Sequence, residues 1–237
     1  MLGVIVNVIT VIIGSSIGLL FKKGIPEKVS SAAMTGLGVC TLYIGISGSL
    51  CGENVLILIA SVVLGVIVGT LLDIDGAVNR LARKVEAKFR KENSKVSITE
   101  GIITATLLFC VGSMTVTGSV QAGINGDNSV LITKAMLDLV SSMMLASTLG
   151  IGVLLSAVAV LVIQGWLVLL AELISPLLST GAINEMTCAG SILIIMIGTN
   201  LMGITKIKVA DFLPAILLAP IIYNIVPLFE KLTGLFA

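Results

Sequence analysis

The stretch LGVIVNVITVIIGSSIGLLF, Leu2 to Phe21, sets the fold class of this protein. It holds no charged residue, and it is long enough for one α-helix to cross the hydrocarbon core of a membrane, which takes about 20 apolar residues. No lysine or arginine precedes it, and it is longer than the apolar core of a signal peptide. We therefore expect this segment to be retained as the first transmembrane helix.

The composition of the whole chain supports the same class. Of its 237 residues 57% are hydrophobic and 11% are charged, whereas soluble domains carry roughly 25% charged residues. The sequence predicts an all-α, polytopic integral membrane protein with about seven to eight transmembrane helices in a single membrane domain, 1–237. The predicted spans are 2–21, 31–50, 55–72, 101–121, 131–149, 151–172, 187–204 and 212–229.

Two of these assignments stay open. Segment 31–50 is rich in glycine and serine, so it is the weakest span. Segments 131–149 and 151–172 meet at Gly150 without a polar loop, and they form either two spans or one long broken helix.

The basic residues predict the orientation. Twelve of the 14 lysines and arginines fall in loops 22–28, 80–95 and 206–208, which lie on one side if there are eight spans. Basic loops stay in the cytoplasm, so we expect both termini outside the bacterial cytoplasmic (inner) membrane. The connector 73–97 carries apolar residues at helical spacing between basic ones, which indicates an amphipathic helix on the inner surface.

Several function classes are disfavoured by what the chain lacks. It has no histidine, the commonest general base and metal ligand. The cysteines Cys40, Cys51, Cys110 and Cys188 show no zinc-binding spacing. With a net charge of +1 there is no basic surplus for nucleic acid. We expect no enzyme activity, no cofactor and no nucleic-acid partner.

The stretch FCVGSMTVTGSVQAGINGD, Phe109 to Asp127, is unusually polar for a span. Unwound backbone is tolerated at membrane depth only where it faces protein or a watery cavity. We expect an interrupted helix here, whose oxygens face an ion or a solute; the alternative is close packing of helices through glycine. The candidate site residues in this stretch are Gly112, Ser113, Thr115, Thr117, Gly118 and Gln121.

Asp138 is the second candidate, because an ionisable group inside a span indicates a functional site by default. The alternative is an i,i+4 pair with Lys134 near the outer surface. We expect Asp138 to converge near mid-membrane with Asn7, Ser141, Ser142, Thr199 and Asn200. No metal other than sodium is predicted, and Ser113, Thr117 and Asp138 are its expected ligands.

Three short segments resemble one another: IIGSSIG at 12–18, CVGSMTVTG at 110–118 and MIGTNLMG at 196–203. On the predicted topology the first runs inward and the second outward. An inverted repeat of the kind found in secondary transporters would give this relationship.

The segments EGIITATLLFCVGSMTVTGSVQAGINGD, LITKAMLDLVSSMMLASTLGIGVLLSAVAVLVIQG and EMTCAGSILIIMIGTNLMGITKIKVADFLPAI resemble the bacterial membrane-protein family known as domain of unknown function 554. The resemblance implies an inner-membrane protein with several spans and a role in transport. Asp127, Lys134 and Asp138 match the family pattern, whereas Thr70 and Gln121 stand where the family commonly has acidic residues.

The favoured function is therefore a secondary transporter that moves a small polar solute and is coupled to an ion, with sodium preferred over the proton. The alternatives are a passive channel or pore, and a membrane scaffold that binds a partner through helix 73–97. The expected partners are a small molecule or ion, the lipid bilayer and other copies of the chain in a homo-oligomer.

Overall fold

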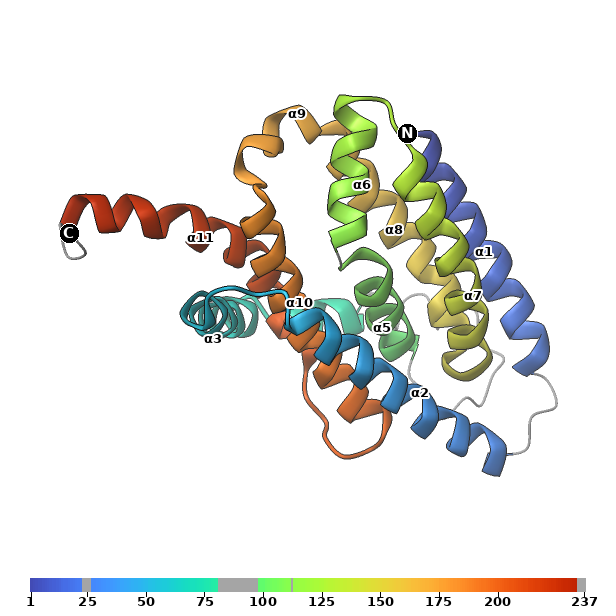
Figure 1. Cartoon of the computed structure of the whole chain (residues 1–237). Helices are drawn as coiled ribbons and strands as arrows, with labels where there is room; N and C mark the ends of the chain where they lie inside the picture. The colour runs from blue at the N-terminus through green and yellow to red at the C-terminus, as the bar shows by residue number, and fades with distance from the viewer. Residues whose placement is uncertain (23–26, 81–97, 112, 234–237) are drawn as a thin grey trace.

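The computed structural model describes residues 1–22, 27–80, 98–111 and 113–233, and throughout these ranges the regular elements are helices (Figure 1). The all-α fold class is confirmed. The elements are α1 (Leu2–Lys22), α2 (Glu27–Ser49), α3 (Val55–Leu71), α5 (Ile98–Cys110), α6 (Ser113–Ile124), α7 (Ser129–Leu149), α8 (Ile151–Leu169), α9 (Ala171–Ile174), α10 (Thr180–Leu201) and α11 (Pro214–Thr233), with 3-10 turns η1 (Ser175–Leu177) and η2 (Val209–Phe212).

Five segments of the described chain are helical, long and apolar enough to cross a membrane: Leu2–Phe21, Ser129–Leu149, Ile151–Leu169, Thr180–Leu201 and Val209–Val226. Two bent helix pairs bring the number to seven if each pair is one span: Val55–Leu71 with Ile74–Arg80, bent by 53°, and Ile98–Cys110 with Met114–Ile124, bent by 60°. The sequence predicts an eighth span at 31–50. That segment lies in the continuous helix α2, which is not among these candidates.

The region around Gly150 forms two separate candidate spans, α7 and α8. Gly150 has φ 79° and ψ −150°, a backbone conformation that suits glycine, and it ends α7. The connector 73–97 is described only as far as Arg80, where it is helical from Ile74; the rest of the predicted amphipathic helix lies outside the described residues.

Helices α1 and α7 run in the same direction (Figure 1), and their backbones approach closely at Gly14 and Gly18. A Cβ on Gly14 would fall 2.3 Å from the carbonyl oxygen of Leu139, and one on Gly18 would fall 2.2 Å from that of Met143. Small residues allow this close approach of backbones, which is how membrane helices associate. The pairing brings the middle of α1 against the middle of α7.

One end of the bundle gathers several helix ends. Gly18 near the end of α1 packs on Ala146 near the end of α7, and Gly152 at the start of α8 packs on Ile98 at the start of α5. The start of α5 shares a cavity with Lys206, just after α10. We call this the basic end, because Lys206 and Lys208 lie there.

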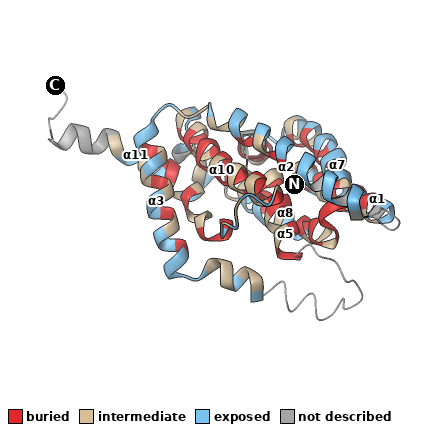
Figure 2. Cartoon of the chain, turned by 90° about the horizontal axis from the view of Figure 1, so that it is seen from below, coloured by how far each residue is buried: buried red, intermediate tan, exposed pale blue. Residues whose placement is uncertain are grey.

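The burial pattern is that of a membrane protein. Many large apolar side chains of α1, α3 and α7 are exposed, and Figure 2 shows exposed residues along these helices. Polar side chains such as Asn7, Ser142 and Gln164 are fully buried instead. Lipid accepts the apolar surface, and a polar group at membrane depth needs protein partners.

Candidate functional site

A central polar cluster, defined as Asn7, Lys134, Asp138 and Gln164, lies between α1, α7 and α8. The Lys134 ammonium donates to the Asp138 carboxylate, and the two side chains are 8% and 7% exposed. The i,i+4 pair that the sequence allowed is therefore formed, and it is buried between helices. A buried charge pair is costly to form, and removing one partner alone leaves an uncompensated charge.

The two amides of the cluster face each other. Asn7 Nδ2 donates to Gln164 Oε1 across 3.1 Å, and neither residue is exposed. Asn7 also lies within reach of the Asp138 carboxylate. Asn7 Oδ1 and Gln164 Nε2 have no partner among the described residues. Buried polar atoms are nearly always hydrogen-bonded, so the cluster retains one acceptor and one donor for a further polar group.

The break between α5 and α6 lies beside this cluster. The Phe109 ring centre is 6.0 Å from Lys134 Nζ, and the Cys110 thiol lies within range of both charges of the pair. Thr115 donates its hydroxyl to the Phe109 carbonyl across 3.0 Å, so it bridges the break. This contact satisfies a carbonyl that the end of α5 leaves unpaired.

The other predicted residues of this stretch are placed as follows. Gly112 lies outside the described residues, and of Ser113 only the helical backbone is described. Gly118 packs on Val130 and Leu131, and Gln121 is exposed near the end of α6. Thr117 is partly buried on the same helix. The interrupted helix is present, and of its hydroxyls Thr115 has a defined role.

Ser141 and Ser142 of α7 form no hydrogen bond with the Lys134–Asp138 pair among the described residues. Ser142 is buried against Gly14 of α1, and it donates to the Leu139 carbonyl of its own helix. Ser141 is exposed. Ser142 thus contributes to the contact between α1 and α7.

Thr199 and Asn200 do not join the central polar cluster. They lie at the basic end of α10, where Asn200 Oδ1 accepts hydrogen bonds from the Thr205 hydroxyl at 2.7 Å and the Ile207 amide at 2.9 Å. Asn200 Nδ2 donates to the Ile207 carbonyl, and the Thr199 hydroxyl contacts that of Thr205. The side-chain amide of Asn200 is hydrogen-bonded to the loop after α10. For this reason Asn200 does not lie with Asp138, contrary to the prediction from the sequence.

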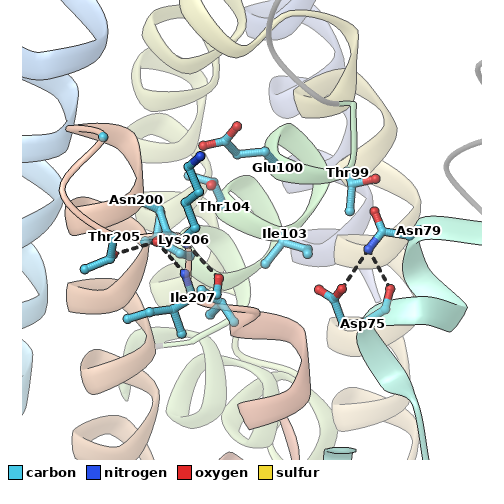
Figure 3. A pocket seen from close by; sticks show the side chains of 13 residues that line it. Asp75, Asn79, Thr99, Glu100, Ile103, Thr104, Asn200, Thr205, Lys206 and Ile207 are labelled. Carbon is cyan, nitrogen blue, oxygen red and sulfur yellow. Dashed lines mark hydrogen bonds between the residues drawn. The ribbon is translucent and has the colours of Figure 1, made fainter.

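An inner cavity of about 360 Å³ opens at the basic end (Figure 3). It lies between the start of α5, the end of α10 with its following loop, and the helical segment Ile74–Arg80. The Asp75 amide donates to the Asp211 carboxylate across 2.9 Å, which fixes that segment against η2. The lining residues are Asp75, Asn79, Thr99, Glu100, Ile103, Thr104, Ile197, Asn200, Gly203, Thr205, Lys206, Ile207 and Val209.

Sequence reasoning did not include Gln164, which belongs to the central polar cluster, among the site residues, and it did not identify Glu185 as a buried carboxylate. Gln164 is noticeable in sequence only as a lone amide in an apolar span, the usual mark of a hydrogen bond between helices. Glu185 is 1% exposed, and its Oε1 accepts the amides of Glu53 and Asn54, both at 2.8 Å. It lies in the first part of α10, which the predicted span 187–204 leaves out.

Asp127, in the turn between α6 and α7, lies outside the membrane-spanning helices. Its carboxylate accepts the Ser129 amide at 2.9 Å, and this hydrogen bond holds the pKa of Asp127 below its ordinary value. Asp127 is exposed and remains charged at neutral pH, so it stabilises the start of α7.

The fold and the site together define a polytopic helical membrane protein with a broken span beside a buried ion pair. Residues 2–224 match the family described as protein of unknown function (DUF554), and the chain belongs to that family. This confirms the resemblance seen in the sequence.

Two bacterial proteins are similar to this chain over most of its length. The "uncharacterized membrane protein YdfK" of Bacillus subtilis (strain 168) is 34% identical over 233 residues, which cover 97% of this chain and 98% of the relative. The "uncharacterized protein YqgA" of Escherichia coli (strain K12) is 29% identical over 221 residues, covering 92% and 94%. No solved structure matches the chain.

Proposed function

We propose that this protein is a secondary transporter that moves a small polar solute across the bacterial inner membrane, with no catalytic step. The observation that carries the proposal is the position of the α5–α6 break directly beside the buried Lys134–Asp138 pair. In secondary transporters, binding sites form near mid-membrane where discontinuous helices meet.

The depth of the site supports this function. Asp138 is the tenth of the 21 residues of α7, and the break at 111–112 falls halfway along the segment Ile98–Ile124. Both features therefore lie near the middle of their spans. An ion pair with a purely structural role is more cheaply held near a membrane surface, where lysine reaches water.

An apolar layer separates the inner cavity from the central polar cluster. Along α5, Thr104 lines the cavity, Leu107 and Phe109 belong to the main hydrophobic core, and Cys110 lies near the ion pair. Ile194 of α10 belongs to the same core. A cavity that is open at one end and separated from the central site by apolar side chains fits one closed state of an alternating-access cycle.

Ion coupling is assigned to Asp138. In the observed arrangement the Lys134 ammonium donates to one oxygen of the Asp138 carboxylate. An ion that binds Asp138 would compete with Lys134 for this carboxylate. Sodium remains the expected ion, with Thr117 as a hydroxyl ligand, and proton coupling is the competing outcome. The predicted ligand Ser113 has its side chain outside the described part of the structure.

The test uses full-length protein in proteoliposomes. Uptake of radiolabelled amino acids, carboxylates, nucleobases and sugars is measured with a sodium gradient, with a proton gradient and without either. We expect accumulation of one class that depends on a gradient. If a solute flows only down its own gradient and neither ion gradient changes the flux, the protein is a passive pore and the transporter proposal is wrong.

The role of Asp138 is tested in the same assay. The double variant Lys134→Gln/Asp138→Asn removes both charges and leaves no unpaired ion in the bundle. It is expected to fold and to lose the gradient dependence, whereas the exposed Asp73→Asn is expected to behave as wild type. Unchanged coupling in a folded double variant would show that the pair is structural.

A further inference from the structure

Two of the charged side chains that line the inner cavity, Lys206 and Glu100, are of opposite sign and face each other. Figure 3 shows the side chains of Lys206 and Glu100 pointing toward one another, from the loop after α10 and from the start of α5. Among the described residues they form no ion pair with each other or with any other group. Lys206 and Glu100 thus have no charged partner among the described residues, and both can bind a ligand.

The remaining polar groups of the cavity set its balance of charge. Asp75 lies on the opposite side, where its carboxylate accepts Asn79 Nδ2 at 2.8 Å. Thr99 and Thr104 contribute buried threonines on the α5 wall. With two carboxylates and one ammonium, the lining disfavours a ligand that carries two negative charges.

The size of the cavity limits the ligand further. Small-molecule sites span roughly 300–1,000 Å³, and this cavity, at about 360 Å³, is at the lower end. Ile103 and Ile197 supply an apolar surface between the polar groups. The space suits a molecule of about amino-acid size with a short apolar part.

We propose that the inner cavity is a binding site for a small zwitterion, whose carboxylate binds Lys206 and whose ammonium binds Glu100. The ligand class is that of neutral α-amino acids. This inference rests on the proposed transport function for its role, with the cavity at the basic end as the place where the solute enters or leaves. Binding itself is independent of transport and is tested separately.

Equilibrium binding is measured on detergent-purified full-length protein with L-alanine, L-serine and L-glutamine as probes. Propionate and ethylamine serve as matched analogues of alanine that each lack one charge. We expect the zwitterions to bind at least about tenfold more tightly than either analogue, because each charge-assisted hydrogen bond is lost with its charge. Equal binding of propionate, or no binding of any zwitterion to folded protein, would overturn the proposal.

Two variants locate the site. Lys206→Gln and Glu100→Gln are each expected to weaken zwitterion binding about tenfold or more. Lys208→Gln is the matched control, because Lys208 is exposed two residues away and does not line the cavity. Binding that survives both cavity variants would place the ligand elsewhere.

Uptake assays keep the two proposals apart. Zwitterion binding that depends on Lys206 and Glu100, without uptake in proteoliposomes, would contradict transport and leave the cavity assignment intact. Gradient-driven uptake that is unchanged in Lys206→Gln and Glu100→Gln would contradict the cavity assignment and leave transport intact.

Discussion

Asn7 and Gln164 are 157 residues apart in the chain, yet Asn7 Nδ2 donates to Gln164 Oε1 across 3.1 Å in a fully buried contact. The bond ties α1 to α8 directly beside the Lys134–Asp138 pair. Asn7 Oδ1 and Gln164 Nε2 lack partners among the described residues. The amide pair therefore holds the two helices together and also presents polar atoms to the central polar cluster.

The first prediction concerns this bond. Asn7→Leu is expected to lower the free energy of unfolding by about 1 kcal/mol, the scale of hydrogen bonds between membrane helices. Gln164→Leu should cost a similar amount, and the double variant should cost less than the sum because neither amide is left alone. Thermal unfolding in detergent measures all three. Strict additivity would show that the two amides do not interact.

The second prediction concerns the buried charges. Asp138→Asn alone leaves the Lys134 ammonium without its carboxylate and should destabilise by about 3–5 kcal/mol. Adding Lys134→Gln should restore most of the loss, since the pair is then neutral. The midpoint temperature of thermal unfolding gives the order of stability of the wild type, Asp138→Asn and the double variant. A double variant less stable than Asp138→Asn would contradict a shared buried pair.

The third prediction concerns the contact between α1 and α7. Gly18→Ala places a methyl group about where Met143 contributes a carbonyl oxygen, 2.2 Å from the ideal Cβ, and overpacking of this kind costs about 1–3 kcal/mol. Gly36→Ala in α2 is the control, because nothing lies within 4 Å of its ideal Cβ. The midpoint temperature of thermal unfolding should fall for Gly18→Ala, and it should stay the same or rise for Gly36→Ala.

The fourth prediction concerns the helix break. Thr115→Val keeps the shape of the side chain but removes the hydroxyl that donates to the Phe109 carbonyl at 3.0 Å. We expect a loss of about 1 kcal/mol in stability and reduced uptake, because the break is no longer held. Thr133→Val is the matched control, since Thr133 is exposed and donates to the Ser129 carbonyl of its own helix. Equal uptake by both variants would contradict a role for the bridge.

The fifth prediction concerns Cys51, in the turn between α2 and α3. Burial raises the pKa of the Cys51 thiol above its ordinary value. A raised pKa keeps the thiol protonated, so its alkylation by a maleimide should begin at higher pH than in the unfolded protein. The same shift contributes stability at low pH that is lost as the pH rises through the folded pKa. Site-resolved mass spectrometry of the alkylation rate against pH measures the difference.

Several features could be predicted from the residues alone. The apolar runs predict most helices, because a membrane span must satisfy its own backbone and is therefore a long uninterrupted apolar segment. The glycines and hydroxyl residues after Phe109 predict the break, because glycine allows a helix to be interrupted and hydroxyl groups supply polar oxygens at membrane depth. Asp138 stands out as the ionisable residue in the middle of its span.

Other features could not be predicted. Segment 31–50 was expected to be a span, and α2 has the required length without the apolar character. Asn200 looked like a site residue because it is an amide at the end of a span, but it holds the loop 205–207. Local sequence does not show whether a polar group is already satisfied by a loop that follows it.

The sequence by itself determined that the chain is a polytopic helical membrane protein, where one helix breaks and that Asp138 lies inside a span. These properties depend on local composition and hydropathy, which each segment carries alone. The tertiary structure decided that Asn7, Gln164 and the Lys134–Asp138 pair meet beside the break, and that Glu100 faces Lys206 across a cavity. These contacts between distant residues depend on which helices pack together. That packing depends on close contacts between helices, such as that of Gly18 with Met143, which exist only in the folded chain.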